Sequence, residues 1–189
     1  MVKYFRVGLL ALCLFAVASV LYTITTRKFE DLKQSLDLYN PQVITAKERE
    51  RQLACLAINI YREAGNEPFE GKVGVAQVTL NRAEHAQFPN DVCAVVYQKN
   101  KVIERVVCQF SWYCDSTHRN RPINQASYKE SEEVAKRVLL ENFRLPSLTD
   151  ALYYHADYVS PNWNLERITK IGRHIFYKPH TKGNKNAQI

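Results

Sequence analysis

A carboxyl side chain lies at a sharp corner of the chain, where it could work as an acid. Glu63 comes near the end of an apolar helical run that includes Leu53. Gly65 and Asn66 are typical of a helix stop, and Pro68 suits the first turn of a second helix. A carboxyl group at such a corner is half desolvated, which raises its pKa and suits it to general acid chemistry near neutral pH.

Two further carboxylates follow closely, at Glu67 and Glu70. On an unbroken helix, spacings of four and three residues would place them on one face with Glu63. The break at the corner means that the three need not converge, so spacing alone does not predict a two-carboxylate site. Glu67 is expected to be exposed at the start of the second helix, where negative charge is favourable. Glu70 could serve the same purpose or line the cleft.

Downstream segments carry amide, hydroxyl and aromatic side chains that suit a sugar. Sugars need hydrogen bonds together with a flat apolar face on which to stack. The candidate groups are Gln109, Ser111, Trp112, Tyr154, Asn162 and Trp163. Phe110 is interpreted as a core residue, whereas Trp112 and Trp163 could each touch the ligand or belong to the core.

Three motifs occur in order and carry a family resemblance. The first is IYREAGNEPFEGKVGVAQVTLNR, which begins at Ile60, and the second is CQFSW, which begins at Cys108. The third combines ALYYHA, PNW and IGRHIFY, between Ala151 and Tyr177. The chain resembles the SleB/CwlJ-type cell wall hydrolases, enzymes that cut peptidoglycan, over about residues 53–178. Arg62, Asn66 and Lys72 differ from the residues commonly found at these positions of the family motif, while Glu63 keeps its place in it.

The resemblance implies a lysozyme-like α+β domain, mainly helical, that cleaves the MurNAc–GlcNAc bonds of glycan strands. Glu63 matches the family's catalytic Glu and would protonate the glycosidic oxygen. With no firm partner carboxylate, we expect a lytic transglycosylase, although ordinary hydrolysis stays open. No cofactor and no metal are expected. The residues expected to bind substrate are Glu70, Gln109, Ser111, Trp112, Tyr154, His155, Asn162, Trp163 and His174.

Two other functions compete with glycan cleavage. His155 and His174 could belong to a zinc-dependent N-acetylmuramoyl-L-alanine amidase, but a third ligand at recognisable spacing is missing. A structural role through hydrogen bonds is simpler for His155 and His174 than zinc binding. A non-catalytic protein that binds the cell wall is the third possibility.

Composition bounds the class of protein. A length of 189 residues with 46% hydrophobic residues predicts one domain with a single core. The net charge of +7 suits an anionic partner such as cell wall, or serves solubility alone. The basic residues are dispersed and no nucleic-acid motif occurs, so we expect no nucleic-acid partner. A monomer is expected.

The N-terminal segment predicts export. Val7–Ile24 is an apolar run of 18 residues without a charge, behind a short basic start. That length is near the lower limit for a membrane-spanning helix. Cleavage after Ala18 is an alternative, and a buried core helix is a third. We expect residues 1–28 to be a signal-anchor segment, with the catalytic domain on the exported side, in the periplasm or cell wall.

The cysteines of an exported protein are expected to form a disulfide. Cys93, Cys108 and Cys114 cluster in the middle of the chain, and we favour pairing of Cys93 with Cys108 or Cys114. Cys55 is interpreted as a small buried apolar residue.

Periodicity and capping signals predict the elements of the domain. A linker or stalk over 29–45 precedes a catalytic domain over 46–180, and a polar tail occupies 181–189. The glycines at 71 and 74 are expected to let the second helix approach the first closely. Helices are expected at 46–64, 68–83, 91–98 and 127–142, the last with Ser127 as its cap. A buried strand or short segment is expected at 151–155, a strand or hairpin arm at 168–177, and a loop or short hairpin at 108–121.

Overall fold

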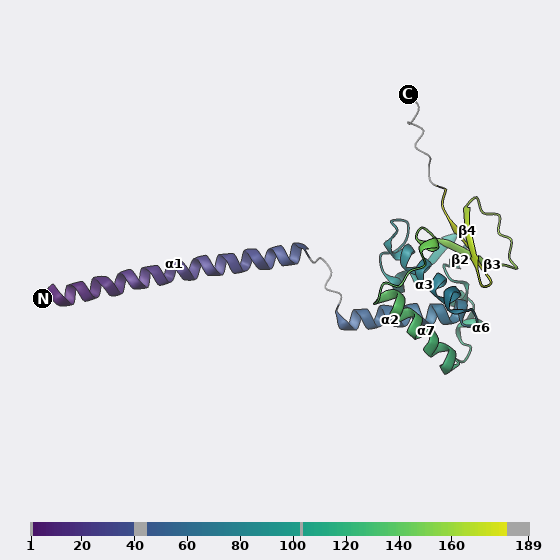
Figure 1. Ribbon diagram of the computed structural model, residues 1–189, viewed down its shortest axis with the longest axis horizontal. Helices are drawn as coiled ribbons and strands as arrows, with labels where there is room; N and C mark the ends of the chain where they lie inside the picture. Colours follow the sequence, from purple (N-terminus) through teal and green to yellow (C-terminus); the bar gives the residue numbers. More distant parts are fainter. Residues whose placement is uncertain (1, 40–44, 103, 181–189) are drawn as a thin grey trace, which may run out of the picture. The chain divides into compact units, whose positions relative to one another are not determined.

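The computed structural model of the protein describes residues 2–39, 45–102 and 104–180, with side chains described over 15–33, 45–101 and 104–180 (Figure 1). The chain divides into two units, 1–45 and 46–189. Residues 40–44 of the predicted linker over 29–45 lie outside the described residues, and so does the predicted tail over 181–189.

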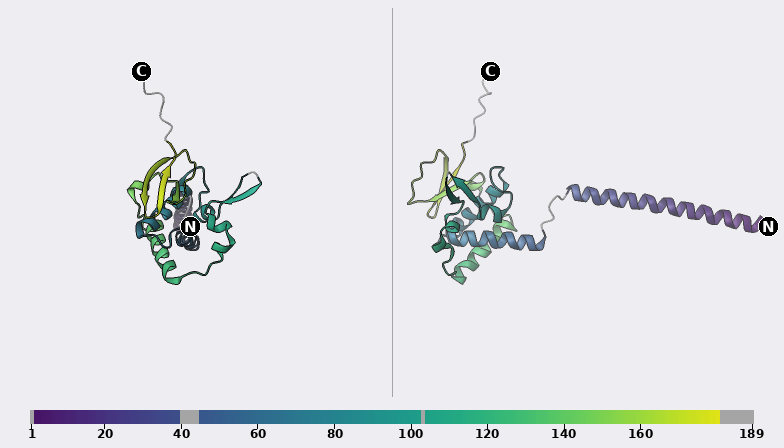
Figure 2. Two further views of the ribbon diagram at one scale, coloured as in Figure 1. Left: turned by 90° about the vertical axis from the view of Figure 1, so that its right-hand side faces the viewer. Right: turned by 180° about the vertical axis from the view of Figure 1, so that it is seen from behind.

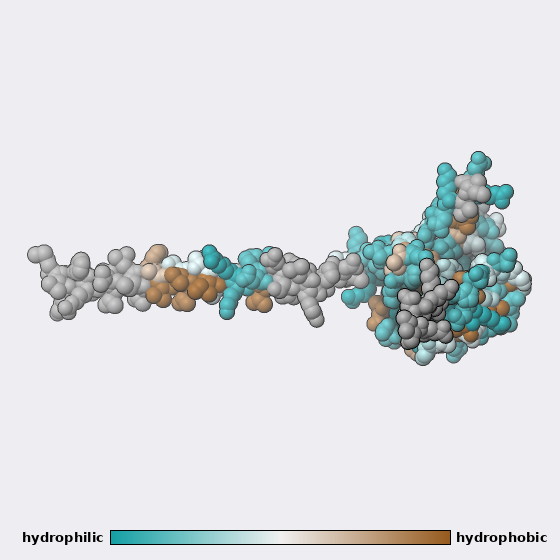
Figure 3. Space-filling model, turned by 90° about the horizontal axis from the view of Figure 1, so that it is seen from above, coloured by the Kyte–Doolittle hydropathy of each residue, from teal (hydrophilic) through white to brown (hydrophobic). Residues whose placement is uncertain are grey.

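The first unit is one long helix, α1, over Val2–Tyr39. Exposed apolar side chains gather on its described part and form the brown surface in Figure 3; they include Phe15, Val17, Val20, Leu21 and Ile24. Within the part of the chain that the structure describes, none of the helices has the length and apolar character needed to cross a membrane. The side chains of residues 1–14, the first half of the predicted anchor over 1–28, lie outside the described ones.

The second unit combines helices with two small antiparallel sheets (Figure 1). Its helices are α2 (Ala46–Ala64), α3 (Phe69–Glu84), α4 (Val92–Val96), α5 (Ser111–Cys114), α6 (Ser116–Arg119), α7 (Gln125–Leu139) and the 3-10 turn η1 (Pro146–Leu148). Its strands are β1 (Lys99–Val102), β2 (Arg105–Cys108), β3 (Tyr153–Ala156), β4 (Glu166–Ile171) and β5 (His174–Lys178). This is the mainly helical α+β fold that the sequence predicts.

Amphipathic helices build the core, because each buries one apolar face. The face of α2 that carries Leu56, Ala57 and Ile60 is fully buried against α3 and α7. The predicted bounds of α2 are confirmed, and those of α3 are correct to within one residue. The predicted cap of α7 is wrong: Asn124 Oδ1 accepts a hydrogen bond from the Ser127 N–H at 3.1 Å, so Ser127 lies inside the first turn.

The larger sheet has the order β3-β5-β4 and covers α3. At its centre, Phe176 is fully buried. A Cβ atom added at Gly74 would lie 2.6 Å from the Phe176 ring, so α3 needs glycine there to approach the sheet. Gly74 therefore lets α3 approach β5 closely, whereas the sequence predicted a close approach of α3 to α2.

The smaller sheet is the β1–β2 hairpin, which projects from the body of the unit (Figure 2). The chain after the hairpin was predicted as a loop or short hairpin, and this prediction is wrong. It forms the two short helices α5 and α6, and the Asp115 side chain caps α6 by accepting hydrogen bonds from the N–H groups of Thr117 and His118.

The second unit contains two disulfides among its described residues, and their pairing differs from the pairing favoured from the sequence. All three predicted cysteines are bonded, but Cys93 pairs with Cys55, and Cys108 pairs with Cys114. The reason is that α4 packs on α2, which brings Cys93 to the buried Cys55.

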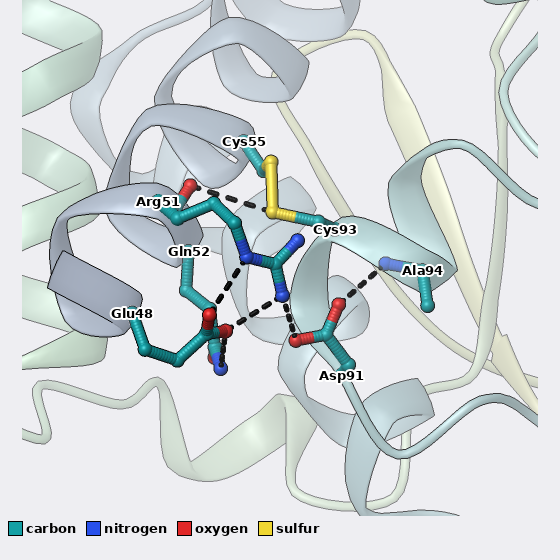
Figure 4. The surroundings of a disulfide bond; sticks show 7 residues. All are labelled: Glu48, Arg51, Gln52, Cys55, Asp91, Cys93 and Ala94. Atoms are coloured by element: carbon teal, nitrogen blue, oxygen red, sulfur yellow. Dashed lines mark hydrogen bonds and ion pairs between the residues drawn. A yellow bond between two sulfur atoms is a disulfide. The ribbon is translucent and has the colours of Figure 1, made fainter. Parts of the chain in front are cut away.

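An ion-pair cluster beside the first disulfide ties the same two helices (Figure 4). Arg51 Nη2 donates to Glu48 Oε1 at 2.6 Å and to Asp91 Oδ2 at 2.7 Å. Asp91 also caps α4 by accepting from the Ala94 N–H. The hydrogen bond from Arg51 lowers the pKa of Glu48 to about 2, so the Glu48 carboxylate stays charged at neutral pH.

Candidate active site

Glu63 lies in the last turn of α2, half-buried, under the edge of the larger sheet. Its Oε2 atom accepts a hydrogen bond from the Tyr154 hydroxyl of β3 at 3.1 Å. Burial raises the pKa of Tyr154 well above its usual value, so the phenol stays a donor at physiological pH. The corner of α2 and the sheet edge therefore hold the predicted acid in one place.

The surroundings of Glu63 favour its protonated form. Burial raises the pKa of the Glu63 carboxyl above its ordinary value of 4.5, while the Tyr154 hydrogen bond and the charge of Arg82 oppose that rise. The negative end of the α2 dipole also disfavours a carboxylate in the last turn. A carboxylic acid that keeps its proton closer to neutral pH can act as a general acid.

A buried arginine lies close enough to Glu63 to act on its charge. Arg82, at the end of α3, is 4% exposed, and its Nε donates to the Leu152 carbonyl oxygen at 2.8 Å. Its guanidinium lies 5.2 Å from the Phe110 ring centroid, and within the described residues its Nη1 atom has no hydrogen-bond partner. No role was predicted for Arg82 from the sequence, although a basic residue at the end of an apolar helical run is a signal for a functional role.

Two cavities adjoin at Glu63. One has a volume of about 550 Å³ and extends toward the start of α7, and the other has a volume of about 460 Å³ and extends toward the CQFSW segment. Both are lined by Glu63, Trp112 and His174. A polymer could therefore pass Glu63 with chain on both sides of it.

Hydrogen bonds from the end of α2 hold the outer wall of the first cavity. Arg62 Nη2 donates to the carbonyl oxygens of Arg119 and Arg121 at 3.1 and 3.0 Å. The Tyr61 hydroxyl accepts from the Asn124 N–H at 2.9 Å. The helix that positions the acid thus also positions the segment between α6 and α7.

Trp112 is mainly a core residue that presents an edge to both cavities. It is 6% exposed, and its Nε1–H donates to Asn59 Oδ1 at 3.0 Å. Asn59 is fully buried one turn before Glu63, and its amide nitrogen donates to Thr79 Oγ1. Asn59 is a second residue for which no role was predicted, although a polar residue on the buried face of an apolar helix is a signal for one.

Glu67 connects the corner between α2 and α3 to the β4–β5 turn. Its Oε2 accepts a hydrogen bond from the Arg173 N–H at 2.9 Å. The turn residue Gly172 has φ +56°, and a Cβ there would lie 2.0 Å from Glu67 Oε2. Glu67 was expected to be exposed at a helix start, but it is half-buried in this contact.

The two motif histidines are both in contact with neighbouring groups of the protein. His155 uses both ring nitrogens, with Tyr177 Oη at 2.9 Å and the Ala156 carbonyl oxygen at 2.8 Å. His174 packs against Tyr154 with ring centroids 5.0 Å apart, and burial lowers its pKa. Among the described side chains, no three His, Cys, Asp or Glu residues gather so that they could hold a metal ion.

The other predicted binding residues fall into three places. Gln109, Ser111 and His155 line the 460 Å³ cavity with Tyr154. Asn162 and Trp163 line a third cavity of about 530 Å³, beside the β1–β2 hairpin. Glu70 is exposed on the first turn of α3 and is not among the residues that line these three cavities.

Comparison with known proteins identifies similar chains. The sequence profile of the cell wall hydrolase family matches residues 66–177. The spore cortex-lytic enzyme of Bacillus cereus is 30% identical over 133 residues, covering 68% of this chain and 45% of that protein. The Bacillus subtilis spore cortex-lytic enzyme is 31% identical over 125 residues, covering 64% of this chain and 35% of that protein. This chain thus spans less than half the length of these curated relatives.

A solved structure is also similar. The crystal structure of the catalytic domain of the Bacillus cereus SleB protein matches with a TM-score of 0.50 at 28% identity, covering 68% of this chain and 91% of that domain. The matched family range begins just after Glu63, so the role of Glu63 rests on its surroundings in this structure.

Proposed function

We propose that this protein, which belongs to the cell wall hydrolase family, cleaves the glycan strands of peptidoglycan with Glu63 as its general acid. The observation that carries the proposal is a carboxyl group whose pKa burial raises, fixed by Tyr154, with a cavity on either side of it. This is the arrangement that protonation of a glycosidic oxygen in the middle of a polymer requires.

Within glycan cleavage, the carboxylate count favours a lytic transglycosylase. Among the residues that the structure describes, the carboxylates lining the two cavities at Glu63 are Glu63 itself and Glu67. Glu67 Oε2 is engaged with the Arg173 N–H, so it is poorly placed to activate a water. A hydrolase of the usual kind needs a second free carboxylate.

The proposed reaction uses Glu63 twice. The Glu63 carboxyl gives its proton to the glycosidic oxygen as the bond from that oxygen to the sugar C1 breaks. The Glu63 carboxylate then takes the proton of the same sugar's C6 hydroxyl while O6 bonds to C1. The products are a chain with a free hydroxyl and a chain ending in a 1,6-anhydro sugar, and the acid is regenerated.

Mass analysis of purified sacculi digested with the protein tests this reaction. We expect anhydro-muramyl ends to accumulate. New reducing ends would replace the transglycosylase by a hydrolase, while free stem peptides would favour the amidase. An unchanged sacculus that still binds the protein would favour a non-catalytic wall-binding role.

The pH dependence should report on the contact between Tyr154 and Glu63. Glu63 works as an acid only when protonated, so kcat/KM falls as pH rises through its pKa. The Tyr154 hydrogen bond lowers that pKa, so Tyr154→Phe should raise it and move the falling limb to higher pH. Measurement of kcat/KM against pH checks this.

Tyr128→Phe is the matched control, because Tyr128 lines neither cavity at Glu63 and its pH profile should equal that of the wild type. A limb that stays in place or moves to lower pH in Tyr154→Phe would contradict the assigned contact.

A further inference from the structure

The cavity beside the β1–β2 hairpin lies apart from Glu63 and faces solvent with sugar-binding groups. Its volume is about 530 Å³, and its lining includes Asn100, Gln109, Asn162 and Trp163. Trp163 is 43% exposed, although large aromatic side chains normally lie mostly buried. An exposed indole among amide side chains offers both a stacking face and hydrogen-bonding groups.

This cavity adjoins the catalytic one. Cys108 and Gln109 line both the 530 Å³ cavity and the 460 Å³ cavity next to Glu63. The Trp163 ring centroid lies 5.5 Å from that of His155, which lines the 460 Å³ cavity. It also lies 6.1 Å from the ring centroid of Tyr153, which lines the 530 Å³ cavity. A chain that leaves Glu63 past Gln109 therefore meets Trp163 next.

One face of the hairpin forms the far wall. Asn100 on β1 and Val107 on β2 are register partners, and both line the cavity. The next pair, Lys101 and Val106, points to the opposite face, because side chains alternate along a strand. The projecting hairpin seen in Figure 2 thus has one face turned toward this cavity.

The base of the hairpin is held by contacts with the body of the second unit. The Gln109 N–H donates to the Gln98 carbonyl oxygen at 2.9 Å, and the Cys108–Cys114 disulfide ties the end of β2 to α5. Lys99 Nζ lies 4.9 Å above the Tyr113 ring. A preformed wall lowers the entropic cost of binding.

We propose that this cavity, between the Asn100–Val107 face of the hairpin and Trp163, is a distal subsite that binds a sugar residue of the same glycan strand, beyond the bond being cut. The inference rests on the proposed glycan-cleaving function and makes the protein prefer long strands over short ones. The indole stacks on a sugar ring, and the amides of Asn100, Gln109 and Asn162 bond its hydroxyl or acetamido groups.

Chain-length dependence of kcat/KM tests the subsite with the full-length protein. The substrates are long peptide-free glycan strands and a tetrasaccharide of the same repeat. Trp163→Ala should lower kcat/KM for long strands by about tenfold, which is the size expected for one aromatic stacking contact. The tetrasaccharide value should change by less than about twofold, because a short chain gains little from a distal site.

A second pair of variants separates binding from folding. Val107→Glu places a bulky charge in the cavity, whereas Val106→Glu places the same charge on the opposite face of the same strand. The two valines are 49% and 59% exposed, so the substitutions should cost similar stability. We expect Val107→Glu to lose the preference for long strands and Val106→Glu to keep it.

The outcomes distinguish a failure of the proposed subsite from a failure of the proposed function. Equal losses on both substrates would make Trp163 a merely structural residue and would overturn the subsite, as would an unchanged preference for long strands in Val107→Glu. If the wild type releases no fragments from purified sacculi, the proposed function fails, whereas a wild type that cleaves neither purified glycan leaves it standing. Binding of long peptide-free strands then decides the subsite: Val107→Glu must bind them more weakly than Val106→Glu, and equal binding overturns it.

Discussion

Replacing Glu63 with glutamine is expected to lower the rate of glycan cleavage by about 10²–10⁴-fold, the usual contribution of a general acid. The amide keeps the shape of the side chain and can still accept the Tyr154 hydrogen bond, but it has no acidic proton to give to the glycosidic oxygen. The measurement is the rate of release of soluble fragments from purified sacculi. Thermal unfolding should show the same folded state as the wild type.

Glu50→Gln is the matched control for this loss. Glu50 lies on the same helix, exposed, and far along α2 from the corner. The control should cleave at the wild-type rate. Wild-type cleavage by Glu63→Gln itself would remove the acid role, and with it the mechanism proposed for this protein.

Removing the Cys55–Cys93 disulfide should have the largest effect on stability. The bond closes a loop over a sequence separation of 38 residues, whereas Cys108–Cys114 spans a separation of 6. The chain-entropy relation then gives a loss of about 4 kcal/mol for the first bond and about 2 kcal/mol for the second. A loss of about 4 kcal/mol is a large share of a typical unfolding free energy of about 5–15 kcal/mol.

Denaturant unfolding of two double variants measures these losses. Cys55→Ala/Cys93→Ala should lower the free energy of unfolding more than Cys108→Ala/Cys114→Ala does. A reversed order would contradict the loop-length argument. The smaller loop carries Gln109, Ser111 and Trp112, so its variant should affect cleavage more than its stability loss suggests.

The disulfides also bear on the compartment. Disulfides persist in oxidising environments, so we propose that residues 46–180 work outside the cytoplasm, as the N-terminal apolar run predicts. Thiol alkylation of intact cells checks this, because protected cysteines at 55, 93, 108 and 114 are expected. Free thiols at these positions would contradict the proposed location.

The sequence by itself determined the helices α2 and α3 and the corner between them that carries the acid. Periodicity, the Gly65 stop and the Pro68 start are signals between residues a few positions apart, so they placed α2 and α3 and put Glu63 in a last helical turn. The three motifs also indicated the family, because each motif is a local pattern of neighbouring residues.

Only the tertiary structure decided what surrounds that acid. Tyr154 meets Glu63 across a separation of 91 residues, and Glu67 meets the Arg173 N–H across 106. Local signals cannot specify which distant side chains converge, because that depends on how α2, α3 and the larger sheet pack together. The same packing brought Cys93 to Cys55, and it buried Arg82 where its charge acts on Glu63.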